Sequence, residues 1–115
     1  MSLIDKSIKI DCPMNIRDVY ERVKPACFCI KGMSVLSFSD NNFSVFLQTG
    51  VTLWSWGENI NITCHYLNNG QTQIQITSSP KIPTILVDYG KGKKNLRKIV
   101  DALRPVLPSI NVVII

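Results

Sequence analysis

Glu58 is the residue whose position in this sequence most strongly suggests chemistry, because it stands among aromatic and aliphatic residues. If residues 54–67 form a strand, alternate side chains share a face, and Glu58 falls on the same face as both tryptophans. A carboxylate is costly to bury there unless it is neutralised or paired with a cation. Glu58 could therefore bind a ligand, or it could act as a general acid or base. The aromatic rings beside it could line a pocket for an apolar ligand, or they could stack on nucleic-acid bases. The candidate ligand-binding residues are Trp54, Trp56, Glu58 and Tyr89.

The same residues also allow a structural interpretation, which we favour. An ion pair between Glu58 and a lysine of residues 91–94 would join the sheet to the last helix, and structural ion pairs also perturb pKa values. Tryptophans usually belong to the core, because each of them buries a large area.

A second candidate site lies at residues 88–97, where basic residues follow two glycines and a helix is expected to begin. Backbone N–H groups at a helix N-terminus, together with lysines, could bind a phosphate. The glycine spacing differs from that of a P-loop or a dinucleotide fingerprint, and basic clusters are often only solvated faces. The candidate anion-binding residues are Lys91, Lys93, Lys94 and Arg97.

Cysteine and histidine do not form a recognisable metal-binding pattern. Cys27 and Cys29 are closer in sequence than zinc ligands usually are, and Cys64 and His65 would point to opposite faces of a strand. With one histidine and no paired carboxylates, a hydrolase has no support. We expect no metal, no cofactor and no enzymatic activity. Free cysteines behave as small hydrophobic residues, so we expect buried thiols at Cys12, Cys27, Cys29 and Cys64.

The composition predicts one folded domain spanning residues 1–115, with 45% hydrophobic and 18% charged residues. No stretch approaches the ~18 apolar residues of a membrane span, and the N-terminus does not resemble a signal peptide. We therefore expect a cytoplasmic protein, in which disulfides are unusual. The net charge is +5, and six of the thirteen basic residues lie between Lys91 and Arg104.

Two segments have the apolar spacing of amphipathic helices. The first follows Asn15, a good N-cap, and is expected to end within about a turn of Pro25. The second runs from Lys93, and Pro105 and Pro108 follow it. Its apolar positions are Leu96, Ile99, Val100, Leu103 and Leu107.

The remaining segments predict an antiparallel sheet. Residues 71–77 alternate strictly between polar and apolar, which indicates one buried and one solvated face. Residues 39–42 have turn chemistry, because Asp and Asn tolerate left-handed conformations, and Asn68-Asn69-Gly70 predicts a second turn. The expected strands are residues 7–11, 28–38, 43–48, 54–67 and 71–77. Residues 84–87 are either a short strand or an extended lead into the last helix, and residues 111–115 either add an edge strand or pack on a partner.

This order predicts an α+β fold of two layers. An antiparallel sheet of about five strands would be covered on one face by an N-terminal and a C-terminal helix.

Two motifs in the chain resemble those of a family of small uncharacterised prokaryotic domains. They are S-W-G-E at residues 55–58 and D-Y-G-K-G-K-K-N at residues 88–95, the second with Tyr89 where the family has tryptophan. The order of elements is also similar to the helix-grip and TATA-binding-protein class of folds. That class includes lipid and hormone carriers and a DNA-binding saddle, so the resemblance implies a fold and no particular function.

Three functions follow as hypotheses. The first is a protein-interaction module that forms a homodimer through an apolar sheet face that two helices cannot cover. The second is a carrier of a small apolar or anionic ligand, held between the sheet and the last helix. The third, nucleic-acid binding, is not favoured and would use Lys93, Lys94, Arg97, Lys98 and Arg104.

Overall fold

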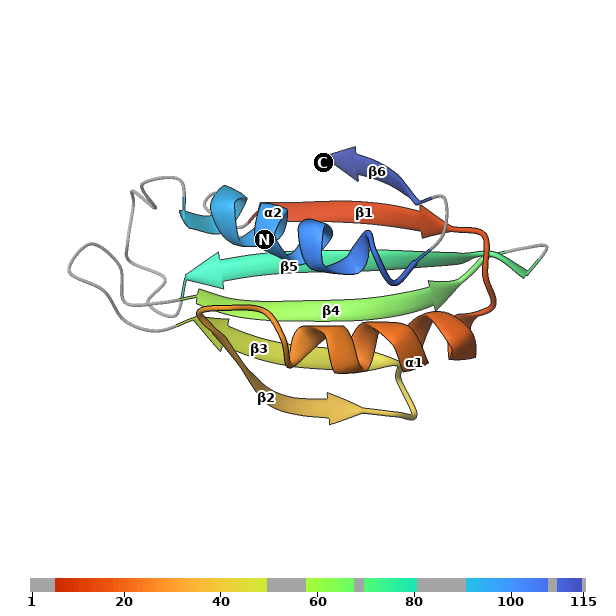
Figure 1. Cartoon of the computed structure of the whole chain (residues 1–115), viewed down its shortest axis with the longest axis horizontal. Coiled ribbons are helices and arrows are strands. Elements are labelled where there is room, and N and C mark those ends of the chain that lie inside the picture. The colour runs from red at the N-terminus through yellow and green to blue at the C-terminus, as the bar shows by residue number, and fades with distance from the viewer. Residues whose placement is uncertain (1–5, 50–57, 68–69, 81–90, 108–109, 115) are drawn as a thin grey trace.

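A computed structural model describes residues 6–49, 58–67, 70–80, 91–107 and 110–114 of the chain (Figure 1). Two helices and six strands are defined within these ranges. In chain order they are β1 (Lys6–Cys12), α1 (Ile16–Cys27), β2 (Met33–Ser39), β3 (Ser44–Thr49), β4 (Glu58–Tyr66), β5 (Thr72–Pro80), α2 (Lys91–Leu103) and β6 (Asn111–Ile114).

The six strands form one sheet in the order β2-β3-β4-β5-β1-β6, and every neighbouring pair is antiparallel. The two-layer α+β architecture expected from the sequence is confirmed. The sheet has six strands where the sequence predicted about five, because the C-terminal tail pairs with β1 as an edge strand. The short strand expected at residues 84–87 lies outside the described residues.

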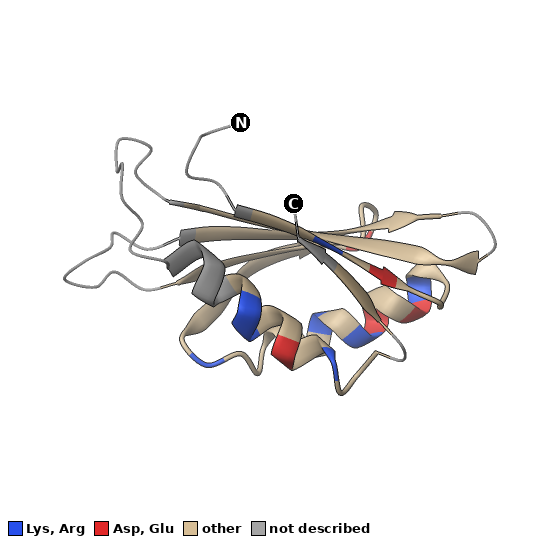
Figure 2. Cartoon of the chain, turned by 90° about the horizontal axis from the view of Figure 1, so that it is seen from above, with Lys and Arg blue, Asp and Glu red and all other residues tan. Residues whose placement is uncertain are grey.

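Both helices lie on the same side of the sheet (Figure 2). α1 packs over β3 and β4, while α2 packs over β1 and β5 and beside α1. The layer between helices and sheet is filled with aliphatic side chains. Val23, Ile62, Ile76 and Leu103 are fully buried there.

The alternation predicted for the central strands is confirmed where they are described. In β4, Ile60 and Ile62 face the helices, while Asn59 and Asn61 are exposed on the opposite face. The five apolar positions that the second helix was expected to turn toward the core are all buried; four of them lie in α2, and the fifth, Leu107, follows the end of the helix at Leu103. Periodicity of two in strands and about 3.6 in helices therefore predicted the inner faces correctly.

The α1 helix begins and ends as the sequence predicts, since its last residue, Cys27, lies within a turn of Pro25. The Asn15 side chain accepts a hydrogen bond of 3.0 Å from the backbone N–H of Asp18, the usual N-cap contact. Pro25 lies in the last turn, where a proline removes only one helical hydrogen bond. The helix therefore continues to Cys27, and the Phe28 N–H still bonds to the Pro25 carbonyl.

Residues 28–38 were expected to form one strand, and this is wrong for the first five of them. Residues 28–32 turn away from the end of α1, and β2 begins only at Met33. Gly32 takes a left-handed φ of +83°, and the Met33 N–H bonds to the Ile30 carbonyl. The apolar residues of this segment resemble a strand, but the turn leaves the Phe28 side chain 62% exposed.

The β2–β3 hairpin forms where predicted, but a different residue takes the left-handed conformation. Asp and Asn were expected to do so, whereas the structure places Phe43 at φ +51°. Two contacts hold this unusual conformation: the Phe43 ring meets the Tyr20 ring edge-on at 5.5 Å, and the Phe43 carbonyl accepts a bond from the Cys64 N–H. Tertiary contacts therefore override the local preference.

Candidate functional site

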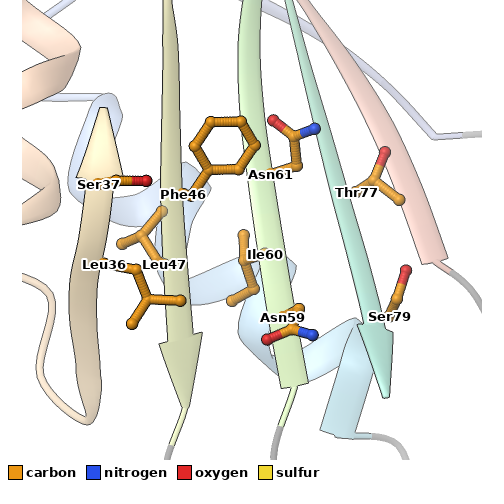
Figure 3. Close-up of a pocket in the computed structure, with 9 residues that line it drawn as sticks. All are labelled: Leu36, Ser37, Phe46, Leu47, Asn59, Ile60, Asn61, Thr77 and Ser79. Atoms are coloured by element: carbon orange, nitrogen blue, oxygen red, sulfur yellow. The ribbon is translucent and has the colours of Figure 1, made fainter. Parts of the chain in front are cut away.

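An open groove of about 590 Å³ lies across strands β2 to β5, on the sheet face that no described helix covers (Figure 3). Its central row consists of Phe46, Asn61 and Thr77, which are register partners on three neighbouring strands. Asn59 and Ser79 form the next row. The groove is therefore built by the outward-facing positions of the sheet, the positions that alternate with the buried core.

The apolar part of the groove comes from Leu36 at the edge of the sheet and from Phe46 on the neighbouring strand. Leu36 is 55% exposed and Phe46 is 38% exposed, and both line the groove. Val35 packs against the core and pairs with Leu47, so alternation alone points Leu36 outward. The register of β2 against β3 then shifts between Val35 and Ser37, and this bulge makes Ser37 the partner of the outward-facing Phe46, so that Ser37 lines the groove as well.

The chemistry of the groove is uncharged. Around the two apolar side chains, its described outward-facing lining consists of hydroxyl and amide groups, and none of these described lining residues is ionisable. Asn61 accepts a hydrogen bond of 3.0 Å from Thr63, which leaves its amide N–H₂ available as a donor. The described lining can therefore bury apolar surface and form neutral hydrogen bonds.

A second cluster ties the β2–β3 turn to α1. The Tyr20 hydroxyl donates a hydrogen bond of 2.7 Å to Asp40 Oδ1, and Lys24 Nζ lies 3.3 Å from the same oxygen. Lys24 also lies over the Phe38 ring, 4.7 Å from its centroid. The hydrogen bond from Tyr20, followed by that from Lys24, holds the pKa of Asp40 below its usual value. We call Tyr20, Lys24 and Asp40 the clasp, and we interpret it as structural because its polar groups already form hydrogen bonds with one another.

We expect the clasp to give the protein an acid-sensitive component of stability. A carboxylate whose pKa is lowered by folding stabilises the folded state at pH values above the pKa of the unfolded chain. This contribution is lost as the pH falls through the lower pKa of the folded state. Tyr20→Phe should therefore lower stability at neutral pH and flatten its decline in acid, as measured by urea unfolding at a series of pH values. Tyr66→Phe is the control, since Tyr66 is 64% exposed. Equal acid slopes for wild type and Tyr20→Phe would contradict this role.

Three of the four cysteines are buried as expected, and one is not. Cys12, Cys27 and Cys64 lie in the core, whereas Cys29 is exposed in the turn after α1. Burial raises the pKa of Cys27 to about 12, and burial, followed by the nearness of Cys27 and Cys12, raises that of Cys64 to about 12. The buried thiols are therefore neutral and poorly reactive at ordinary pH. Among the described residues, no three His, Cys, Asp or Glu side chains are grouped so as to hold a metal ion.

The two candidate sites from the sequence lie only partly within the described chain. Trp54, Trp56 and Tyr89 are outside it. Glu58 is described as the first residue of β4, paired with Pro80, and α2 begins at Lys91. The starts of β4 and α2 lie at the same end of the molecule (Figure 1). The Glu58–lysine ion pair stays a prediction.

For some of the predicted basic residues the structure describes only the backbone, and for others it describes the side chain as well. Lys91, Lys93 and Lys94 are placed in the first turn of α2 by their backbone. Arg97 and Lys98 are exposed on the next turn. Neither Arg97 nor Lys98 lines the groove, and the polar groove residues were not predicted. The signals for the groove in the sequence were Phe46, an apolar residue in the outward register of its strand, and the apolar residues that the preceding strand carries in both registers.

Neither helix in the described ranges has the length and apolar content needed to cross a bilayer.

Comparison with known proteins supports the fold and does not name a family. The sequence matches no family model and no curated protein. Among solved structures, the chain is similar to a protein from Nitrosospira multiformis, with 10% identity over 91% of this chain and 97% of that one, and a TM-score of 0.65. It is also similar to a START superfamily protein from Mycobacterium smegmatis, with 10% identity, 88% and 94% coverage and a TM-score of 0.56.

A third similar structure is Ara h 8.0201, with 8% identity, 86% and 93% coverage and a TM-score of 0.58. These likenesses show a helix-grip fold, which was one of the two fold types that the order of elements implied. At such low identity they show the fold alone. The S-W-G-E and D-Y-G-K motifs extend outside the described residues, so the motif family stays a prediction.

Proposed function

We propose that this protein is a non-enzymatic interaction module that self-associates through the uncovered face of its sheet. The observation that carries the proposal is the joint exposure of Leu36 and Phe46 in the groove on that face. Large apolar side chains exposed side by side favour association, because their burial removes apolar surface from water. A polar rim of hydroxyls and amides around an apolar centre is also the usual anatomy of a protein interface.

The distribution of charge supports a second copy as the partner. A protein with a net charge of +5 repels its own copies, unless the contacting surfaces are neutral. The described residues that line the groove are uncharged, while the helices on the other side of the sheet bear most of the charge (Figure 2). Two copies can therefore pack sheet face against sheet face, with the basic helix layer of each copy on the outside.

The edges of the sheet favour face-to-face packing over edge-to-edge pairing. Strand β2 has a bulge at Leu36, and β6 at the opposite edge has only four residues. Bulges and short strands are the devices that keep exposed sheet edges from pairing with other chains. We therefore expect association through side chains of the uncovered sheet face, and not through backbone pairing at the sheet edges.

The test is native mass spectrometry combined with gel filtration over a wide concentration range. We expect a species of twice the 12.9 kDa chain mass, which Phe46→Ser converts to monomer while the circular dichroism spectrum is retained. Phe28→Ser is the matched control, because Phe28 is an even more exposed phenylalanine that does not line the groove. A monomer at every concentration, or a dimer that survives Phe46→Ser, would overturn the proposal.

A ligand carrier is the second candidate, and the helix-grip fold is the observation that favours it. Its site would lie at the end of the molecule where β4 and α2 begin, near Glu58. The same mass spectra distinguish it, since a monomer that retains a small molecule would support the carrier. Loss of that added mass in Glu58→Gln would then assign Glu58 to the ligand.

A further inference from the structure

The positive charge of this protein is concentrated on its helix layer. Residues 16–31 and 91–104, the two helices with their following turns, contain ten of the thirteen basic residues and three of the eight acidic ones. These two segments therefore bear a charge of +7, and the rest of the chain bears −2. Because both helices lie on one side of the sheet, the protein has one basic face (Figure 2).

A compact part of this face surrounds the turn between α1 and β2. Lys31 is exposed in that turn, and Nζ of Lys98 in α2 lies 3.6 Å from the point where a Cβ on Gly32 would be. Arg97, next to Lys98, is exposed as well. No ion pair joins Lys31, Arg97 or Lys98 to another described side chain, so the three positive charges are available to a partner.

Phe28 adds an apolar group to the same turn. It is the C-cap residue of α1, three positions before Lys31, and its side chain is 62% exposed. We define the turn patch as Phe28, Lys31, Arg97 and Lys98. It combines one protruding aromatic ring with three unpaired cations.

We propose that the turn patch docks the protein onto an anionic lipid surface. Stable attachment to a membrane generally takes two signals, an apolar insertion and a group of basic residues, and the turn patch supplies both. Phe28 enters the boundary between headgroups and acyl chains, while Lys31, Arg97 and Lys98 lie at the level of the lipid phosphates. Nucleic acid is the less suitable partner, because single-stranded sites usually offer several aromatic rings on which successive bases stack.

The proposal is tested by co-sedimentation with vesicles. The protein should bind vesicles that contain phosphatidylglycerol, bind weakly to phosphatidylcholine alone, and dissociate as salt is added. Phe28→Ala should weaken binding about tenfold, and Arg97→Gln combined with Lys98→Gln should weaken it by about tenfold or more. All of these positions are exposed, so the variants are expected to fold normally.

Tyr66→Ala and Lys9→Gln are the matched controls. Tyr66 is 64% exposed at the end of β4, and Lys9 lies on the sheet in β1, so neither belongs to the turn patch. Both should bind as wild type does. Equal binding to neutral and anionic vesicles, or equal losses in Phe28→Ala and Tyr66→Ala, would overturn the proposal. So would oligonucleotide binding that depends on Arg97 and Lys98 but not on Phe28, in the absence of vesicle binding.

Discussion

The free energy of unfolding should fall steeply between pH 9 and pH 12. The cause is the pair of buried thiols at Cys27 and Cys64, whose pKa burial raises from about 9.0 to about 12. In this window the unfolded chain releases these protons while the folded chain still holds them, so rising pH favours the unfolded state. Each thiol contributes up to about 4 kcal/mol of this loss by pH 12. That is a large part of a typical total stability of about 5–15 kcal/mol.

Urea unfolding followed by circular dichroism at several pH values measures this effect. Cys27→Ala combined with Cys64→Val should reduce the alkaline slope, although it lowers stability at neutral pH through the cavity it leaves. A residual slope is expected from Tyr20, whose pKa is raised by burial and by its hydrogen bond to Asp40. Cys29→Ser is the control, because that thiol is exposed. If the double variant retained the full slope, the buried thiols would not be its source.

Leu103→Ala should lower the free energy of unfolding by about 2–5 kcal/mol, the usual cost of truncating a fully buried leucine. Leu103 is fully buried in the last turn of α2, where the helix packs on β1 and β5. The cost includes both the lost apolar burial and the cavity that remains between the two layers.

Chemical denaturation of the wild type and two variants checks this prediction. Arg104→Ala is the neighbouring control, since Arg104 is exposed and its substitution should change stability by no more than about 0.5 kcal/mol. A similarly small change for Leu103→Ala would show that α2 contributes little to the folded state. Such a result would contradict the packing of helix on sheet described above.

The inner faces of the elements could be predicted from the sequence, because burial follows local periodicity. Residues 71–77 alternate and became a half-buried strand, and the five apolar positions expected of the second helix are all buried, although the last of them, Leu107, lies beyond the end of α2. The N-cap at Asn15 and the hairpin turn after β2 were also predictable, since both depend on side chains and backbone a few residues apart.

The candidate site could not be predicted, because it depends on registers between distant segments. Phe46, Asn61 and Thr77 are far apart in sequence and meet only because three strands pair in one particular register. The exposure of Phe28 depends on a turn that the apolar sequence around it does not reveal, and the bulge that brings Ser37 to the groove depends on how β2 pairs with β3. Cys29 is exposed for the same reason as Phe28.

The sequence by itself determined the two-layer α+β class, the faces of its helices and strands that form the core, and the basic character of the second helix. These follow from spacing and composition, which act over a few residues. Only the tertiary structure decided the strand order, with β1 between β5 and β6, and the approach of Lys98 in α2 to Gly32 in the turn after α1. The physical reason is that such neighbours are set by the sum of many weak contacts between remote segments, and no single local pattern encodes that sum.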